Sequence, residues 1–208
     1  MESKEQIVSV AEQLFLKYGV RSVTMDDIAK QLGISKKTIY QYFADKDEVV
    51  GLATLRILER EKQLIEEVQQ QSKNAIHELH LTTKYIRQHI TDINPSALFD
   101  IQKYHRDAWK IYLEFKDSVF IQTTESSIRR GMEEGYFRGD INPKILAKLR
   151  IEQIHVAFNE QVFPKNEFDW TEVHLQIFYN FCYGLLTPKG VELFENYAKN
   201  LTTHVSQS

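Results

Sequence analysis

The stretch TMDDIAKQLGISKKTIYQYFADKDEVV, residues 24–50 of a 208-residue chain, decides the fold. It contains three signals for the start of a helix, each a short oxygen-bearing side chain ahead of a helical pattern: Thr24 with Asp27, Ser35, and Asp45 with Glu48. Gly33 lies where a tight turn needs a residue that tolerates positive φ. An apolar stripe from Ile7 to Tyr18 precedes this stretch. The pattern therefore predicts three short helices, followed by a longer fourth helix from Lys46.

Two of these short helices have the arrangement that fits duplex DNA. The major groove accepts one α-helix, which must be held away from the protein body by a second helix and a tight turn. Segment 35–42 would be the reading helix, because Ile39 and Phe43 would pack inward and turn the polar side chains outward: Lys36, Lys37, Thr38, Tyr40, Gln41 and Tyr42. Lysines and hydroxyls bind phosphates, and a glutamine can pair with a base edge. Lys46, in the first turn of the next helix, would hold a further phosphate.

Each of these residues also has a plainer interpretation. The three lysines could be ordinary solvated surface, and Tyr40 could lie half-buried beneath the reading helix. The helix-turn-helix context favours the DNA-binding interpretation over both alternatives.

Stretch 24–50 resembles the DNA-binding signature of the TetR/AcrR family of bacterial transcriptional regulators, in spacing and in residue types. The segments GYFRGDINP at 135–143 and LLTPKG at 185–190 are more weakly similar to members of that family. The resemblance implies a two-fold dimer, an operator with two half-sites, and a ligand pocket in the C-terminal domain. It also implies DNA contacts at Thr24, Lys36, Thr38, Tyr40, Gln41, Tyr42 and Lys46. Asp26 and Lys37 depart from the family pattern, so no operator sequence is implied.

Composition and charge are compatible with this interpretation. The net charge is −3, but residues 30–46 carry four lysines against one aspartate, and binding depends on where charge is placed. One cysteine, Cys182, excludes an internal disulfide and favours a reducing cytoplasm. No apolar run is long enough to cross a bilayer, and the N-terminus lacks the apolar core of a secretory signal. We therefore expect a cytoplasmic protein without a membrane association.

Helical spacing continues through the rest of the chain, which has few glycines and almost no strand-like alternation. We expect an all-α fold with a helix-turn-helix DNA-binding domain at residues 1–46 and a helical ligand-binding and dimerisation domain at 47–208. A single helix between residues 95 and 134 would be improbably long, so a break is expected near His105, with Asp107 as the cap.

Two helices near the C-terminus each show two apolar faces, at residues 144–162 and 171–186. One face would meet the domain itself, and the other, which includes Ile177 and Phe181, would meet a partner subunit. We therefore expect a homodimer with a four-helix interface; the alternative is one large monomeric core.

A polar and aromatic stripe suggests a ligand pocket, because an aliphatic core stripe would rarely be so polar at its tips. The candidate ligand contacts are His105, Trp109, Tyr112 and Lys116, with Phe120 and Phe158 as apolar walls. The alternative is a helix half-exposed at the surface. The pair His77 and His80 lacks an evident third ligand, so no metal is expected, and no motif suggests a cofactor.

These observations predict a regulator of transcription, most simply a repressor that a small-molecule inducer releases from its double-stranded DNA operator. The alternative is a DNA-bound regulator that a protein partner controls. An enzyme is not expected, since no cluster of titratable groups can be assembled from the sequence.

Overall fold

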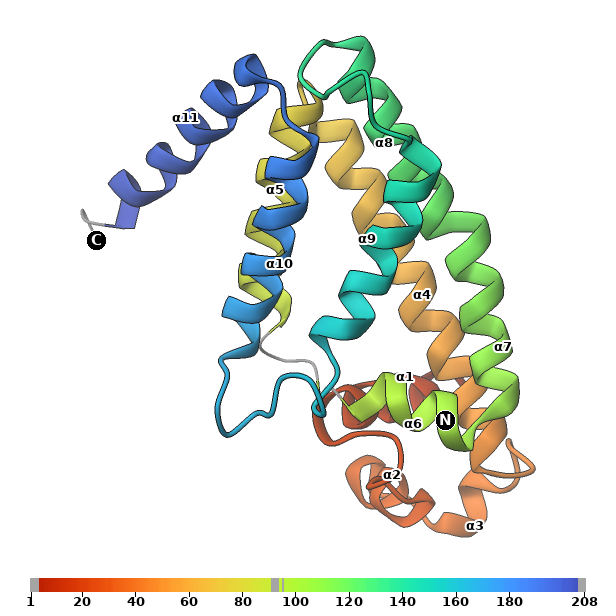
Figure 1. Cartoon of the computed structure of the whole chain (residues 1–208). Coiled ribbons are helices and arrows are strands. Elements are labelled where there is room, and N and C mark those ends of the chain that lie inside the picture. Colours follow the sequence, from red (N-terminus) through yellow and green to blue (C-terminus); the bar gives the residue numbers. More distant parts are fainter. Residues whose placement is uncertain (1–3, 91–93, 95, 206–208) are drawn as a thin grey trace.

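The computed structural model describes residues 4–90, 94 and 96–205, with side chains up to Tyr197. The described part is all-helical, as predicted, apart from one isolated bridge between Phe137 and Leu186. Figure 1 shows a small N-terminal unit joined to a long helical body. In chain order the helices are α1 (Lys4–Tyr18), α2 (Met25–Leu32), α3 (Lys36–Ile39), α4 (Lys46–Gln71), α5 (Ala75–His89), α6 (Ser96–Tyr104), α7 (Arg106–Phe115), a π-helical turn (Lys116–Phe120), α8 (Ile121–Glu133), α9 (Pro143–Ala157), α10 (Trp170–Leu185) and α11 (Pro188–Val205).

Local capping sets the helix boundaries of the N-terminal unit. Thr24 caps α2 in a complete capping box with Asp27, and Gly33 ends that helix in the left-handed region at φ 71°. Ser35 caps α3 by accepting a hydrogen bond from the Thr38 backbone N–H at 3.1 Å. These caps satisfy backbone donors that a helix end leaves without partners, which is why the sequence located them correctly.

The core of the N-terminal unit extends beyond the three short helices. Its buried residues come from α1, α2 and α3 and also from the first two turns of α4, where Val49, Val50 and Ala53 are almost fully buried. Ala97 and Ile101 of α6 and Ala108 of α7 belong to the same cluster. α6 therefore packs directly against the N-terminal unit. The domain boundary at residue 46 stays a prediction.

A second core cluster holds the body together. Its residues lie on α5, α8, α9, α10 and α11, and include Ile76, Ile128, Leu175 and Leu185, all nearly inaccessible to solvent. α4 is 26 residues long, about 39 Å at 1.5 Å per residue, and runs from the N-terminal unit to the far end of the body (Figure 1). α11 contacts α5 as far as Tyr197, which packs on His77 and His80, and its later turns project away from the other helices (Figure 1).

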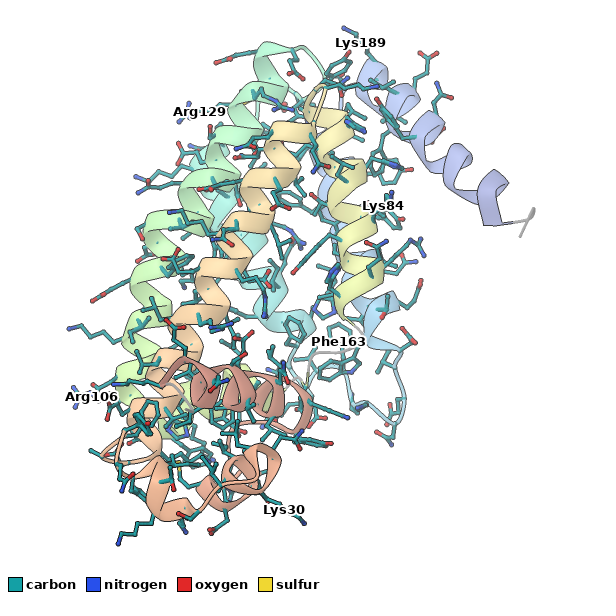
Figure 2. The ribbon with its side chains drawn as sticks, turned by 180° about the vertical axis from the view of Figure 1, so that it is seen from behind. Lys30, Lys84, Arg106, Arg129, Phe163 and Lys189 are labelled. Atoms are coloured by element: carbon teal, nitrogen blue, oxygen red, sulfur yellow. The ribbon has the colours of Figure 1, made fainter. Side chains whose placement is uncertain are left out.

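The predicted break near His105 is confirmed, but Asp107 is not the cap. α7 begins at Arg106, so Asp107 lies within its first turn, and His105 occupies the N-cap position without a side-chain cap bond. From Arg106 the chain stays helical through the π-turn to Glu133, and Figure 2 shows this rod running from Arg106, beside the N-terminal unit, to Arg129 at the other end of the body.

The two predicted interface helices differ in how closely their observed bounds agree with the predicted ones. α10 agrees with the prediction to within one residue at each end, whereas α9 ends at Ala157 and not at residue 162. The apolar spacing continues past Ala157, but the chain turns at Asn159, whose carbonyl accepts from the backbone N–H groups of Val162 and Phe163.

Within the described residues, no helix is both long enough and apolar enough to cross a membrane.

Candidate nucleic-acid interface

α2 and α3 present one exposed surface at the end of the molecule farthest from α8. Ile28 and Ile39 are fully buried and Phe43 is 2% exposed, so these three side chains fix α3 against the unit's core. Figure 2 shows Lys30 of α2 pointing outward at this end. The inward packing of Ile39 and Phe43 is therefore as predicted.

α3 is shorter than the predicted reading helix, because only residues 36–39 are α-helical and the chain continues as turns to Tyr42. The Phe43 N–H still donates to the Ile39 carbonyl at 3.1 Å, which keeps the segment compact. Tyr40 is 47% exposed, Tyr42 is 39% exposed, and Lys37 and Gln41 are exposed as well. The side chains that carry phosphate-binding and base-reading chemistry thus share the solvent side of this segment.

Lys36 is paired with the acid that departs from the family pattern. Its ammonium lies 2.7 Å from Asp26 Oδ2, and both side chains are exposed. The hydrogen bond and the charge of Asp26 raise the pKa of Lys36 above its ordinary value. Lys36 therefore stays charged, but part of its attraction for a phosphate is offset by the carboxylate beside it.

Two hydroxyls of the predicted contact set are engaged within the chain. Thr24 Oγ1 donates to Asp27 Oδ2 at 2.6 Å and accepts from the Asp27 backbone N–H at 3.2 Å. Thr38 Oγ1 lies 2.8 Å from Ser35 Oγ, at the start of the reading segment. Both hydroxyls support the helix starts on which the exposed residues depend.

Lys46 is partly buried and holds the start of α4 against the N-terminal unit. Its ammonium donates to the Val20 carbonyl at 2.6 Å and lies over the Phe15 ring. Desolvation lowers its pKa, an effect that the nearby carboxylate of Asp100 opposes. To reach a phosphate, Lys46 would have to leave Val20, a constraint that the sequence did not reveal.

The junction between the N-terminal unit and the body contains polar contacts that sequence reasoning missed. His105 Nδ1 lies 2.6 Å from Asp47 Oδ1, which joins the start of α7 to the first turn of α4. Asp100 of α6 accepts from the Arg21 backbone N–H at 2.9 Å. No spacing rule points to these pairs, since their members are 58 and 79 residues apart.

Four of the six candidate ligand contacts are engaged with neighbouring side chains. His105 lies at the junction, and Trp109 stacks on Tyr112 with ring centroids 5.0 Å apart. The Tyr112 hydroxyl is hydrogen-bonded to His155 Nε2 of α9. Lys116 forms an ion pair with Glu152, also of α9, at 3.0 Å. The stripe thus contacts α4 through His105 and α9 through Tyr112 and Lys116.

The other two candidates lie in separate aromatic groups. Phe120 packs edge-on against Phe115, with centroids 5.2 Å apart, at the π-turn. Phe158 packs against His174 of α10 at 4.2 Å and against Trp170 at 6.1 Å. An open hollow of about 390 Å³ lies elsewhere, between Lys62–Gln69 of α4 and Ser118–Ser126, and none of the six residues lines it.

The apolar faces of α9 and α10 are covered to different extents. On α10, Phe181 is only 8% exposed and lies beneath Arg150, so this predicted interface residue belongs to the chain's own core. On α9, three apolar residues stay exposed, at 63% for Ile145, 46% for Leu149 and 44% for Val156. Their spacing of i, i+4 and i+11 places them on one stripe of the helix.

Other features singled out in the sequence have structural surroundings. Cys182 is fully buried, as its apolar neighbours predicted. His77 and His80 both pack against the Tyr197 ring, with centroids 5.2 and 5.1 Å away. In the part of the chain that the structure describes, no group of three or more metal-ligating side chains is placed to hold an ion.

Comparison with known proteins agrees with this architecture. Residues 7–52 match the family model for bacterial regulatory proteins of the tetR family. The HTH-type transcriptional regulator YvaF of Bacillus subtilis is 26% identical over 153 residues, which cover 73% of this chain and 80% of that protein.

Two solved structures show the same fold. A TetR-family regulator from Agrobacterium tumefaciens superposes with a TM-score of 0.75 at 14% identity, covering 88% of this chain and 97% of that one. A transcriptional regulator from Saccharomonospora viridis, in complex with choline, superposes with a TM-score of 0.71 at 18% identity and the same coverage. Together with the helix-turn-helix geometry, these matches lead to one conclusion: residues 7–52 form a DNA-binding domain of the tetR family of bacterial regulatory proteins, in a chain that is similar over most of its length to HTH-type transcriptional regulators.

Proposed function

We propose that this regulator is a repressor, which binds a two-fold DNA operator as a homodimer and leaves it when a small molecule binds the helical body. The observation that supports it most directly is the α2–α3 surface, where Lys37, Tyr40 and Gln41 are exposed on a segment fixed by Ile39 and Phe43. Lysine and tyrosine supply phosphate contacts, and glutamine can read a base edge. The protein would act in the cytoplasm, where its operator is.

The exposed apolar stripe of α9 supports the dimer. Ile145, Leu149 and Val156 expose apolar surface on one side of the helix, and exposed apolar patches mark surfaces that a partner covers. Tyr183 of α10 is also 48% exposed, and its ring packs edge-on against Phe194 of α11. We therefore place the interface on the outer sides of α9 and α10, which would relate the two reading surfaces by a two-fold axis.

The junction between unit and body supports release by a ligand. A ligand can change DNA affinity only through its different affinity for dimers that fit and do not fit the operator. The contacts of His105 with Asp47 and of Asp100 with Arg21 attach the N-terminal unit to α6 and α7, so movement of those helices would change the separation of the reading surfaces. The Saccharomonospora viridis regulator, which has the same fold, is bound to choline, and this is a precedent for a small ligand.

One observation favours the alternative, control by a protein partner. Trp109 and Tyr112 stack on each other, and Tyr112 and Lys116 pair with side chains of α9. Of the six candidates, Phe158 retains the best claim to contact a ligand, because it lines the α9–α10 contact at His174.

Selection of bound duplexes from random DNA tests the proposal. We expect two inverted half-sites, with centres about 10 base pairs or a multiple of that apart, bound by a dimer. Binding to all duplexes alike would contradict operator recognition, and one unpaired half-site per protein would contradict the dimer.

A further inference from the structure

Arg150 of α9 is a buried cation with no anionic partner among the residues that the structure describes. Arg150 is only 9% exposed. Its guanidinium lies over the rings of Phe178 and Phe181, 4.8 and 5.7 Å from their centroids. No hydrogen bond or ion pair joins it to any residue that the structure describes. Its titratable neighbour Cys182 stays neutral, because burial raises the pKa of that thiol. Two aromatic faces compensate only part of the cost of burying a charge.

A polar atom without a partner among the described residues lies on the other helix of this contact. His174 of α10 is 4% exposed, and its Nδ1 lies 2.8 Å from the Trp170 carbonyl oxygen. Because a carbonyl can only accept, Nδ1 carries the proton, and burial together with the charge of Arg150 lowers the pKa of His174 and keeps the ring neutral. Nε2 is then a hydrogen-bond acceptor, and it is buried without a donor among the described residues.

Gln153, one turn along α9 from Arg150, adds a third group: its Oε1 is buried and also lacks a partner among the residues described. One cation and two acceptors on α9 and α10 thus lack partners among the described residues, which is unusual, since buried polar groups are nearly always satisfied. Phe158, Phe178 and Phe181 supply aromatic surface around them.

We propose that the α9–α10 contact is the effector site of this regulator, and that its ligand is a hydroxylated aromatic carboxylic acid. The carboxylate would pair with Arg150 through two parallel hydrogen bonds, and the hydroxyl would donate to His174 Nε2 or Gln153 Oε1. The aromatic ring would pack among the phenylalanines. The proposal rests on the proposed ligand-released function and specifies its ligand; a cation such as choline would be repelled by Arg150.

The surrounding contacts supply a route from this site to the DNA-reading unit. Arg150 and His174 are closed over, so a ligand must displace α9 relative to α10. α9 holds α7 through the bond of His155 with Tyr112, and holds the π-turn through the ion pair of Glu152 with Lys116. The α7 N-terminus in turn contacts the first turn of α4, through His105. The stripe along α7 thus transmits the displacement, and does not itself bind the ligand.

Thermal unfolding of the full chain tests the site, with 4-hydroxybenzoate, benzoate and choline chloride as probes at equal ionic strength. At about 100 times its Kd, 4-hydroxybenzoate should raise Tm by about 5–10 °C. Benzoate should bind more weakly, because it leaves the acceptors without a donor, and choline should give no shift. Arg150→Met should abolish the shift, whereas Lys148→Met, which removes an exposed charge from the same helix, should retain it. If Arg150→Met does not fold, Arg150→Lys replaces it, because lysine keeps the charge without the planar guanidinium. Arg150→Lys should bind 4-hydroxybenzoate at least tenfold more weakly than the wild type does.

No shift with either acid, or equal shifts in the wild type and Arg150→Met, would overturn the site. An equal response to benzoate and 4-hydroxybenzoate would overturn the role of the hydroxyl. Operator affinity is measured separately. An acid that binds the protein without weakening its binding to the operator would contradict the proposed release. A wild-type protein that binds no DNA would contradict the proposed function, but would leave the result of thermal unfolding unaffected.

Discussion

Asp26→Asn should tighten DNA binding. Asp26 lies 2.7 Å from the Lys36 ammonium on the exposed side of the α2–α3 surface, so the wild-type lysine must leave a carboxylate in order to meet a phosphate. An exposed pair of this kind contributes little free energy, because solvent screens it. A dimer breaks two such pairs on binding, and removing them should increase affinity about 2- to 30-fold.

The gain should depend on salt. If each freed Lys36 forms one more phosphate contact, the slope of log K against log salt should steepen by about 0.9 per subunit. Fluorescence anisotropy with a labelled operator duplex, titrated between about 50 and 200 mM salt, measures both quantities. Asp117→Asn is the matched control, because it removes the same charge from an exposed position on the π-turn of the body.

The double variant decides whether Lys36 is the cause. In a Lys36→Ala background, Asp26→Asn should gain less than in the wild type, since no cation remains to be freed. Weaker binding by Asp26→Asn would refute the reasoning, because it would mean that the carboxylate positions Lys36 for its contact.

Three further outcomes are expected. Gln41→Ala should cost about 1–3 kcal/mol of operator affinity and relax the preference at one base pair per half-site, whereas Lys37→Ala should weaken binding to all duplexes; equal loss on every duplex for both variants would contradict base reading by Gln41. Leu149→Asp should yield folded monomers by light scattering and circular dichroism, because this side chain is 46% exposed in one chain, and a dimer that persists would move the interface away from α9. Stability should fall as pH drops below about 6.5, since burial lowers the pKa of folded His174 and the unfolded chain binds the proton first; His174→Gln should flatten this dependence in denaturant titrations, and an unchanged slope would assign it to other groups.

The helix boundaries of the N-terminal unit could be predicted from sequence because their causes are local. A cap joins residues three apart, as Thr24 and Asp27 do, and a left-handed stop needs only the glycine at Gly33. The inward positions of Ile39 and Phe43 follow from helical spacing within one segment. These features do not depend on where the rest of the chain lies.

Interactions between distant segments could not be predicted in this way. The sequence predicts that Lys46 is a free surface cation, but folding places the Val20 carbonyl 2.6 Å from its ammonium. The sequence likewise predicts that the stripe along α7 is a pocket wall, but α9 supplies partners for Tyr112 and Lys116. The burial of Arg150 over two rings of α10 is likewise invisible in the sequence of α9. The helix-turn-helix and the all-α class were therefore determined by short-range spacing. Which polar groups are satisfied, and which are left for a ligand, was decided by packing alone, because solvation and partner choice depend on neighbours that the chain brings together only in three dimensions.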